Sequence, residues 1–208
     1  PVLMAFLPIA LVLVVYFTWR RRWGEYGFRP IRSIPRTDWK YYLPLVAVLL
    51  ILATQGFKAM TASDVLYFLL FTLLVGFVEE TLYRGLILTL LLKKGTAIAV
   101  AVSSMLFAVT HAANALSGQS AADTAVQIAY SLLIGLSLSL FMVRNRNIVP
   151  LIVFHFLHNW IQFSTAETTS NGLNLLIMAV LLVQCVWMIA ASKRPGEKKG
   201  ISAPPVPN

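Results

Sequence analysis

Two adjacent glutamates and an arginine interrupt the apolar stretch GFVEETLYRGLI at residues 76–87. An ionised carboxylate that faces lipid at mid-membrane depth costs at least about 2.5 kcal/mol, so these side chains must face protein or water. Glu80 and Arg84 are four residues apart, which places them on one helix face where they can pair. Glu79 is turned about 100° from Glu80, because an α-helix has 3.6 residues per turn. One carboxylate can therefore be held by Arg84 while the other points elsewhere.

All three histidines of the chain lie in two further apolar stretches. His111 follows Phe107 by four residues in the stretch SSMLFAVTH. His155, His158 and Asn159 occur within five residues, and His155 and Asn159 share a helix face because they are four residues apart. Ionisable groups inside a membrane face a cavity or another helix and mark a functional site by default.

A glutamate, two histidines and an asparagine suit the hydrolysis of an amide bond. A buried glutamate can deprotonate a water molecule, and a histidine can orient that water. A second histidine and an amide can donate hydrogen bonds to the oxyanion that forms from the carbonyl group. A zinc ion held by two histidines and a glutamate is an alternative way to activate the water, although the one-helix His-Glu-x-x-His signature is absent.

Other hydrolase chemistries fit the residues less well. A serine enzyme needs an exposed serine in a glycine-framed loop, and Ser117 and Ser137 are weak candidates. An aspartyl enzyme needs two deep aspartates, but both deep acids are glutamates. The single cysteine, Cys185, can form no internal disulfide, and we predict that it is a small buried hydrophobic residue.

The composition places these groups in a membrane. The chain has 208 residues, of which 58% are hydrophobic and 12% charged, whereas a soluble domain is roughly 45–50% apolar and about 25% charged. Because the alternating polarity of a membrane β-barrel is absent, the sequence predicts an all-α, polytopic membrane helical bundle. About seven transmembrane helices are expected, at residues 3–19, 41–57, 65–92, 96–113, 123–143, 148–165 and 172–191. The chain begins at Pro1 rather than Met, so an eighth helix in the full protein is an open alternative.

The basic residues are segregated among the predicted loops. Of the 17 Lys and Arg residues, only Lys58 and Arg84 lie outside one alternate set of loops and the tail. The positive-inside rule places this set in the cytoplasm and the start of the chain outside. The set comprises Arg20, Arg21, Arg22, Arg29, Arg32, Arg36, Lys40, Lys93, Lys94, Arg144, Arg146, Lys193, Arg194, Lys198 and Lys199.

This topology accounts for the net charge of +9 without a nucleic-acid partner, and none is predicted. We predict a single membrane-embedded domain at residues 1–191, followed by a disordered basic cytoplasmic tail at residues 192–208. The expected location is the plasma membrane of a bacterium.

Three motifs resemble those of the CPBP family, the CAAX-protease and bacteriocin-processing (Abi) membrane proteins. EETLYR, from Glu79 to Arg84, is similar to the family's Glu-Glu-x-x-x-Arg motif, and FAVTH, from Phe107 to His111, is similar to its Phe-x-x-x-His motif. HFLHN, from His155 to Asn159, is similar to its His-x-x-x-Asn motif. Each motif is short, but all three occur in order on separate predicted helices. The resemblance covers residues 65–165.

The resemblance implies an intramembrane endopeptidase, because the family includes the type II CAAX prenyl endopeptidases, which remove the last three residues after a prenylated cysteine. It implies that Glu79 and His111 activate the water and that His155 and Asn159 form the oxyanion hole. It also implies that the site opens to the cytoplasm, as in CAAX-type members.

Further expectations concern the surroundings of this site and its partners. Glu80 and Arg84 are implied to support it, and His158, which is not a motif position, is expected to be structural or to support the motif residues. A zinc ion, if present, would be held by Glu79, His111 and His155, although we expect a glutamate-activated water without tightly bound zinc. The expected partners are membrane lipid and a peptide or lipidated-protein substrate. A peptide precursor is the favoured substrate in a bacterium, where prenylated CAAX proteins are not expected.

Two alternatives to an enzyme stay open. The same fold could serve as a non-catalytic membrane scaffold or bacteriocin immunity protein, although the intact motif set argues against this. A proton-coupled transporter could use Glu79 and the histidines as a relay. It would require inverted repeats or broken helices, and the sequence shows neither.

Overall fold

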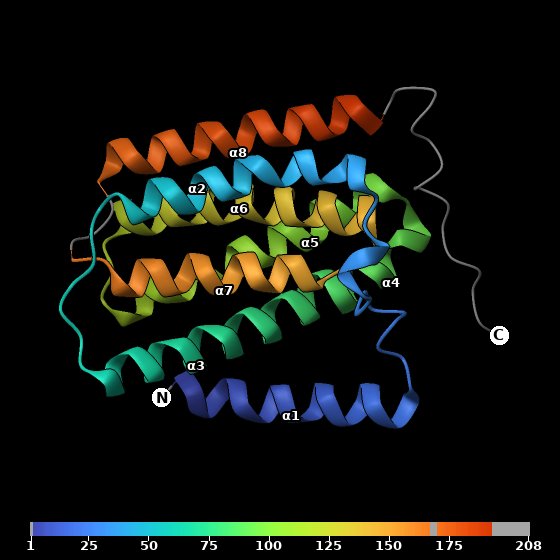
Figure 1. Cartoon of the computed structure of the whole chain (residues 1–208), viewed down its shortest axis with the longest axis horizontal. Helices are drawn as coiled ribbons and strands as arrows, with labels where there is room; N and C mark the ends of the chain where they lie inside the picture. Colours follow the sequence, from blue (N-terminus) through green and yellow to red (C-terminus); the bar gives the residue numbers. More distant parts are fainter. Residues whose placement is uncertain (1, 167–169, 193–208) are drawn as a thin grey trace.

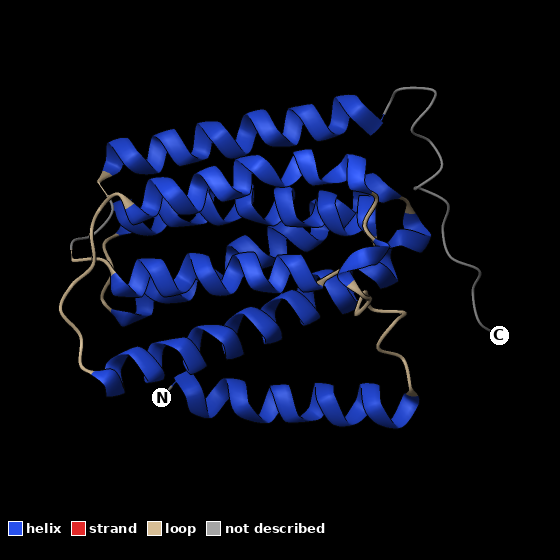
Figure 2. Cartoon of the chain, in the orientation of Figure 1, coloured by secondary structure: helices blue, strands red, loops and turns tan. Residues whose placement is uncertain are grey.

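The computed structural model describes residues 2–166 and 170–192, and its elements are helices (Figures 1 and 2). Within these residues the only β-type pairing is an isolated bridge between Phe57 and Thr165. The all-α helical bundle predicted from the sequence is therefore confirmed. The predicted disordered tail lies outside the described residues from position 193 onward.

Each of the predicted apolar stretches contains a helix. The first three are α1 (Val2–Arg20), α2 (Leu43–Ala53) and α3 (Ala62–Glu80). A π-helix (Thr81–Leu88), α4 (Thr89–Leu91) and a 3-10 turn (Leu92–Lys94) continue α3 without a break. The remaining helices are α5 (Thr96–Thr110), α6 (Ala121–Asn145), α7 (Val149–Ser164) and α8 (Asn171–Ser192). Short 3-10 helices occupy Ile31–Ser33, Arg36–Tyr42 and His111–Ser117.

Four of the described helices are long and apolar enough to cross a membrane. They cover Ala62–Lys94, Thr96–Ala113, Ala121–Asn145 and Gly172–Ser192. The helix Ala5–Arg20 is apolar but shorter, and α2 and α7 have 11 and 16 residues. The length and composition of the four long helices make the chain an integral membrane protein.

Local signals in the sequence determine where the long helices begin. Thr61 caps α3, because its hydroxyl accepts a hydrogen bond from the Asp64 backbone N–H while the Asp64 carboxylate accepts one from the Thr61 N–H. Ser120 caps α6 through a hydrogen bond from the Asp123 backbone N–H. Gly95, with φ of 112°, ends the long helix that begins at Ala62 and allows the chain to turn into α5.

Two glycines bring the motif-bearing helices close together. A Cβ atom on Gly76 of α3 would lie 3.2 Å from the Phe156 backbone nitrogen and 3.3 Å from the Ile152 carbonyl oxygen of α7. A Cβ atom on Gly135 of α6 would lie 3.1 Å from the Ser104 Cα atom of α5. The absence of side chains at these points therefore allows α3 to pack directly on α7, and α5 on α6.

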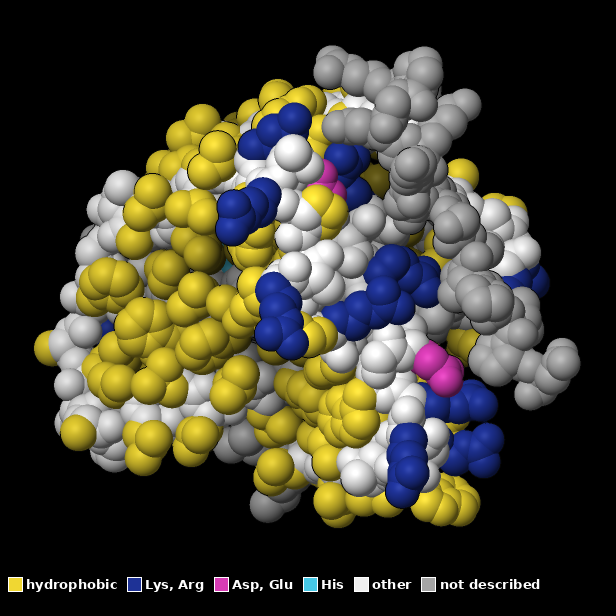
Figure 3. All heavy atoms as spheres, turned by 45° about the vertical axis from the view of Figure 1, so that its right-hand side comes forward, with side chains coloured by type: hydrophobic (Ala, Val, Ile, Leu, Met, Phe, Trp, Pro, Cys, Tyr) yellow, Lys and Arg dark blue, Asp and Glu magenta, His cyan; other side chains and the backbone are white. Residues whose placement is uncertain are grey.

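The described basic loops meet at one end of the bundle. Figure 3 shows Lys and Arg side chains gathered on this face. The segment between α1 and α2 is held at this end by hydrogen bonds. Arg144 donates to Asp38 at 2.9 Å. The Asn147 amide donates to the Arg29 and Pro30 carbonyl oxygens at 3.1 and 3.0 Å. The bundle thus has one basic end and one end that is poor in basic residues.

Candidate active site

A fully buried ion pair lies beside the junction of α3 and the π-helix. Arg84 Nη1 donates to Glu80 Oε1 at 2.8 Å, and neither side chain is exposed. Their spacing in the sequence allows this pairing, but the π-helix that carries Arg84 was not predicted. π-Helical segments are rare in proteins, and those that occur often lie at functional sites.

His155 of α7 lies between the two glutamates. Its Nδ1 atom is 2.8 Å from Glu80 Oε1, and its Nε2 atom is 3.5 Å from Glu79 Oε2. An ionised carboxylate can only accept a hydrogen bond, so Nδ1 carries a proton and donates a hydrogen bond to Glu80. The other face of the imidazole is thereby directed toward Glu79. Glu80 thus positions His155 and holds Arg84 with the same oxygen atom.

Phe107 of α5 joins the arginine to both motif histidines. The Arg84 guanidinium lies 4.2 Å from the centroid of the Phe107 ring, a distance at which cation–π attraction operates. The same ring is 4.9 Å from the His111 ring and 5.8 Å from the His155 ring. Sequence reasoning assigned no role to Phe107, although its place in the motif indicated one.

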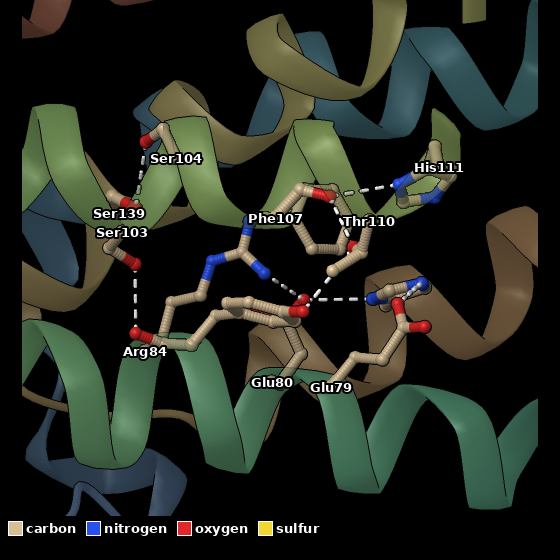
Figure 4. Close-up of polar contacts among 11 residues, drawn as sticks. Glu79, Glu80, Arg84, Ser103, Ser104, Phe107, Thr110, His111 and Ser139 are labelled. Atoms are coloured by element: carbon tan, nitrogen blue, oxygen red, sulfur yellow. Dashed lines mark hydrogen bonds and ion pairs between the residues drawn. The ribbon is translucent and has the colours of Figure 1, made fainter. Parts of the chain in front are cut away.

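His111 is the first residue after α5. Its Nδ1 atom is 2.9 Å from the Phe107 carbonyl oxygen, which can only accept a hydrogen bond. Nδ1 therefore carries the proton, and the lone pair on Nε2 is left to accept a proton or orient a water molecule. Figure 4 shows His111 on the α5 side of the site and Glu79 and Glu80 on the α3 side.

A second hydrogen-bonded chain reaches Asn159 of α7. The Tyr130 hydroxyl of α6 lies 2.7 Å from His158 Nε2, and His158 Nδ1 lies 3.3 Å from Asn159 Oδ1. Tyr130 and His158 are both buried. Sequence reasoning missed Tyr130, because a single tyrosine in an apolar helix carries no signal of its own.

One cavity of about 1240 Å³ brings the four predicted catalytic residues together. Glu79, His111, His155 and Asn159 all contribute to its lining, as do Tyr83, Thr110 and Tyr130 from among the residues that were not predicted. Glu80 and Arg84 are absent from the described lining and lie behind it, where they contact His155 and Phe107.

The cavity does not extend to the end of the bundle that sequence reasoning expected. Its lining continues past Asn159 to Gln119 and Asp123 at the start of α6 and to Ser170 and Asn174 at the start of α8. This end is opposite to the basic loops. An opening at the basic end, which the family resemblance implied, is therefore not what the cavity shows.

The residues present do not fit a three-ligand zinc site. Within the described part of the chain, no three His, Cys, Asp or Glu side chains are grouped so that they could hold a metal ion. Glu79 and His155 are adjacent, but His111 is not grouped with them.

Comparison with known families gives a match that covers all three motifs. Residues 61–161 match the family of type II CAAX prenyl endopeptidase Rce1-like proteins. No curated protein and no solved structure matches the chain. The match confirms the family resemblance that the three motifs indicated.

Proposed function

We propose that this chain, whose residues 61–161 belong to the Rce1-like type II CAAX prenyl endopeptidase family, is an intramembrane endopeptidase. In this proposal it hydrolyses a peptide bond near the end of a membrane-associated substrate, either CAAX-like or a peptide precursor. The observation that carries the proposal is the shared cavity. Its lining includes the Glu79 carboxylate, the His111 and His155 imidazoles and the Asn159 carboxamide, which come from three segments that are separate in the sequence.

Glu79 is the proposed general base. Its side chain is 18% exposed, whereas that of Glu80 is fully buried and holds both Arg84 and His155. Glu79 is therefore the carboxylate that can reach a water molecule. It takes one proton from the water as the oxygen attacks the peptide carbonyl, while the lone pair on His111 Nε2 orients that water.

His155 and Asn159 are the proposed donors to the oxyanion. The proton on His155 Nδ1 is held by Glu80, so His155 donates to the oxyanion as an imidazolium, whose second N–H, on Nε2, is directed into the cavity. The Asn159 amide nitrogen supplies the second donor. As the tetrahedral intermediate collapses, the C–N bond breaks and Glu79 returns its proton to the leaving amine.

Replacing Asn159 by Ala should slow turnover by about 10²–10³-fold, the usual loss for one oxyanion donor. The donor acts on charge that develops in the transition state, so we expect kcat to fall while KM changes little. Steady-state kinetics on a cleaved peptide would measure this, with the melting temperature as a check on folding. A rise in KM at unchanged kcat would assign Asn159 to substrate binding instead.

The proposed function is tested by identifying the products of peptide cleavage in H₂¹⁸O. Purified protein in proteoliposomes would be incubated with a library of membrane-anchored peptides, and the products analysed by mass spectrometry. We expect one ¹⁸O atom from water in the new carboxyl group of each cleaved peptide. If a folded sample cleaves nothing, the non-catalytic scaffold reading is favoured.

A further inference from the structure

The direction of the cavity bears on where the substrate comes from. Beyond the motif residues, the lining runs to Gln119 and Asp123 at the start of α6, to Gln162 near the end of α7, and to Ser170 and Asn174 at the start of α8. Among the described residues, no part of the lining comes from residues 20–58, 84–106 or 135–153, which include the described basic loops. A molecule that enters the cavity from water therefore arrives at the end opposite to these loops.

The charge of the lining bears on what the substrate is. The carboxylates in the described lining belong to Glu79 and Asp123, and this lining contains no Lys or Arg. Arg84 lies behind the cavity and is paired with Glu80. The other polar contributions beyond the motif residues are mainly amides and hydroxyls, which suit an uncharged peptide backbone. A carboxylate that enters this lining meets the acidic side chains of Glu79 and Asp123 and no Lys or Arg among the described residues.

We propose that the cavity receives a neutral or cationic peptide segment from the face opposite the basic loops and disfavours a peptide whose free C-terminal carboxylate must enter it. By the positive-inside rule this face is the non-cytoplasmic one. The substrate class is then an exported peptide or an outer-leaflet-anchored precursor cut away from its terminal carboxylate. The inference about the substrate rests on the proposed function, whereas the inference about direction rests on the cavity and the positive-inside rule.

The side of the membrane on which this face lies is tested by labelling single cysteines in spheroplasts with a membrane-impermeant maleimide. In a Cys185→Ala background, Ala122→Cys reports the end at which α6 begins, and Lys94→Cys reports the basic end; both positions are exposed. We expect Ala122→Cys to be labelled in intact spheroplasts and Lys94→Cys only after lysis. The reverse pattern would overturn the inference about direction, whether or not the protein is an enzyme.

The charge preference is tested with peptides synthesised in pairs. Members of a pair differ only in the terminal group, carboxylate or carboxamide, placed three residues after the scissile bond. We expect the carboxamide to be cleaved at least about tenfold faster, because the terminal carboxylate would be repelled by the carboxylates of Glu79 and Asp123 in a lining whose described residues include no Lys or Arg. Equal rates, or faster cleavage of the carboxylate, would overturn the charge preference. If neither member of any pair is cleaved, the proposed function and the substrate inference both fall, while the labelling result stands.

A separate observation carries a second inference, about His158. Asn159 Oδ1 can only accept, so the contact at 3.3 Å requires a proton on His158 Nδ1. His158 Nε2 then accepts from the Tyr130 hydroxyl at 2.7 Å. In this chain Tyr130 donates to His158 and His158 donates to the Asn159 side-chain oxygen. The Asn159 carboxamide is thereby held by its oxygen, and its N–H groups remain available to the cavity. We infer that His158 and Tyr130 are positioning residues for Asn159.

Two substitutions separate this role from packing. In His158→Asn the side-chain amide nitrogen takes the place of Nδ1, so it can still donate to Asn159. In His158→Gln the amide nitrogen takes the place of Nε2, so it cannot donate to Asn159. We expect His158→Gln to lower kcat at least about tenfold at unchanged KM, and His158→Asn to stay within about threefold of the wild type. Packing alone would favour Gln, which is closer to His in size. Better activity in His158→Gln than in His158→Asn would overturn the inference.

Discussion

Replacing Glu79 by Gln is expected to reduce peptide cleavage by about 10³–10⁴-fold, the upper part of the range for loss of a general base. The carboxamide keeps the size of the side chain but cannot take a proton from water. The Glu80–Arg84 pair is untouched, so the melting temperature should stay close to that of the wild type. The measurement is kcat/KM for a cleaved peptide, with enzyme in excess where turnover is slow.

The matched control is Glu25→Gln. Glu25 is an exposed carboxylate between α1 and α2, where it pairs loosely with Arg22 at 3.7 Å. We expect this variant to cleave at the wild-type rate. If Glu79→Gln kept more than about a tenth of the wild-type activity, another group would have to be the base, and the division of labour between the two glutamates would be wrong.

Replacing Arg84 by Ala is expected to lower the free energy of unfolding by about 3–5 kcal/mol, the usual result of leaving one partner of a buried ion pair alone. Glu80 would stay fully buried beside His155 without its cation. The Phe107 ring would also lose the guanidinium that lies 4.2 Å from it. Thermal unfolding of the purified protein in detergent measures the effect, which should appear as a large drop in melting temperature.

Arg22→Ala is the control for this prediction. Arg22 and Glu25 form a partly exposed ion pair, and such pairs contribute about 0–1 kcal/mol. A melting temperature for Arg84→Ala equal to that of Arg22→Ala would mean that the buried pair does not stabilise the fold. Glu80→Gln should be milder than Arg84→Ala, because it leaves a cation that still lies over the Phe107 ring.

Much of the fold follows from the sequence because lipid imposes a simple rule. Backbone polar groups in a bilayer must bond within a helix or a closed barrel, so apolar stretches without alternating polarity become helices. The ends of these helices were predictable only approximately. In particular, α2 ends at Ala53 rather than near residue 57. The expected range 96–113 matches a continuous helical span, but the change from α-helix to 3-10 helix at His111 was not predicted. At this point His111 shares the cavity with Glu79 and His155.

Other features depend on tertiary contacts that no local pattern encodes. The π-helix at Thr81–Leu88 mixes good and poor helix formers, as the α-helix before it does, so nothing in its sequence distinguishes the two. The spacing in α7 indicated that His155 and Asn159 share a face, but not that His155 touches both glutamates of α3. That contact depends on Gly76, which lets the two helices approach. The direction of the cavity likewise depends on how α6, α7 and α8 pack at their ends.

The most direct test of the account is cleavage of membrane-anchored peptides by the purified wild type and by Glu79→Gln, side by side, each with and without a metal chelator. We expect truncated peptides from the wild type only, in equal amount with and without the chelator. Cleavage by both proteins, or cleavage by the wild type that the chelator abolishes, would contradict the claim that the Glu79 carboxylate activates the water without a metal.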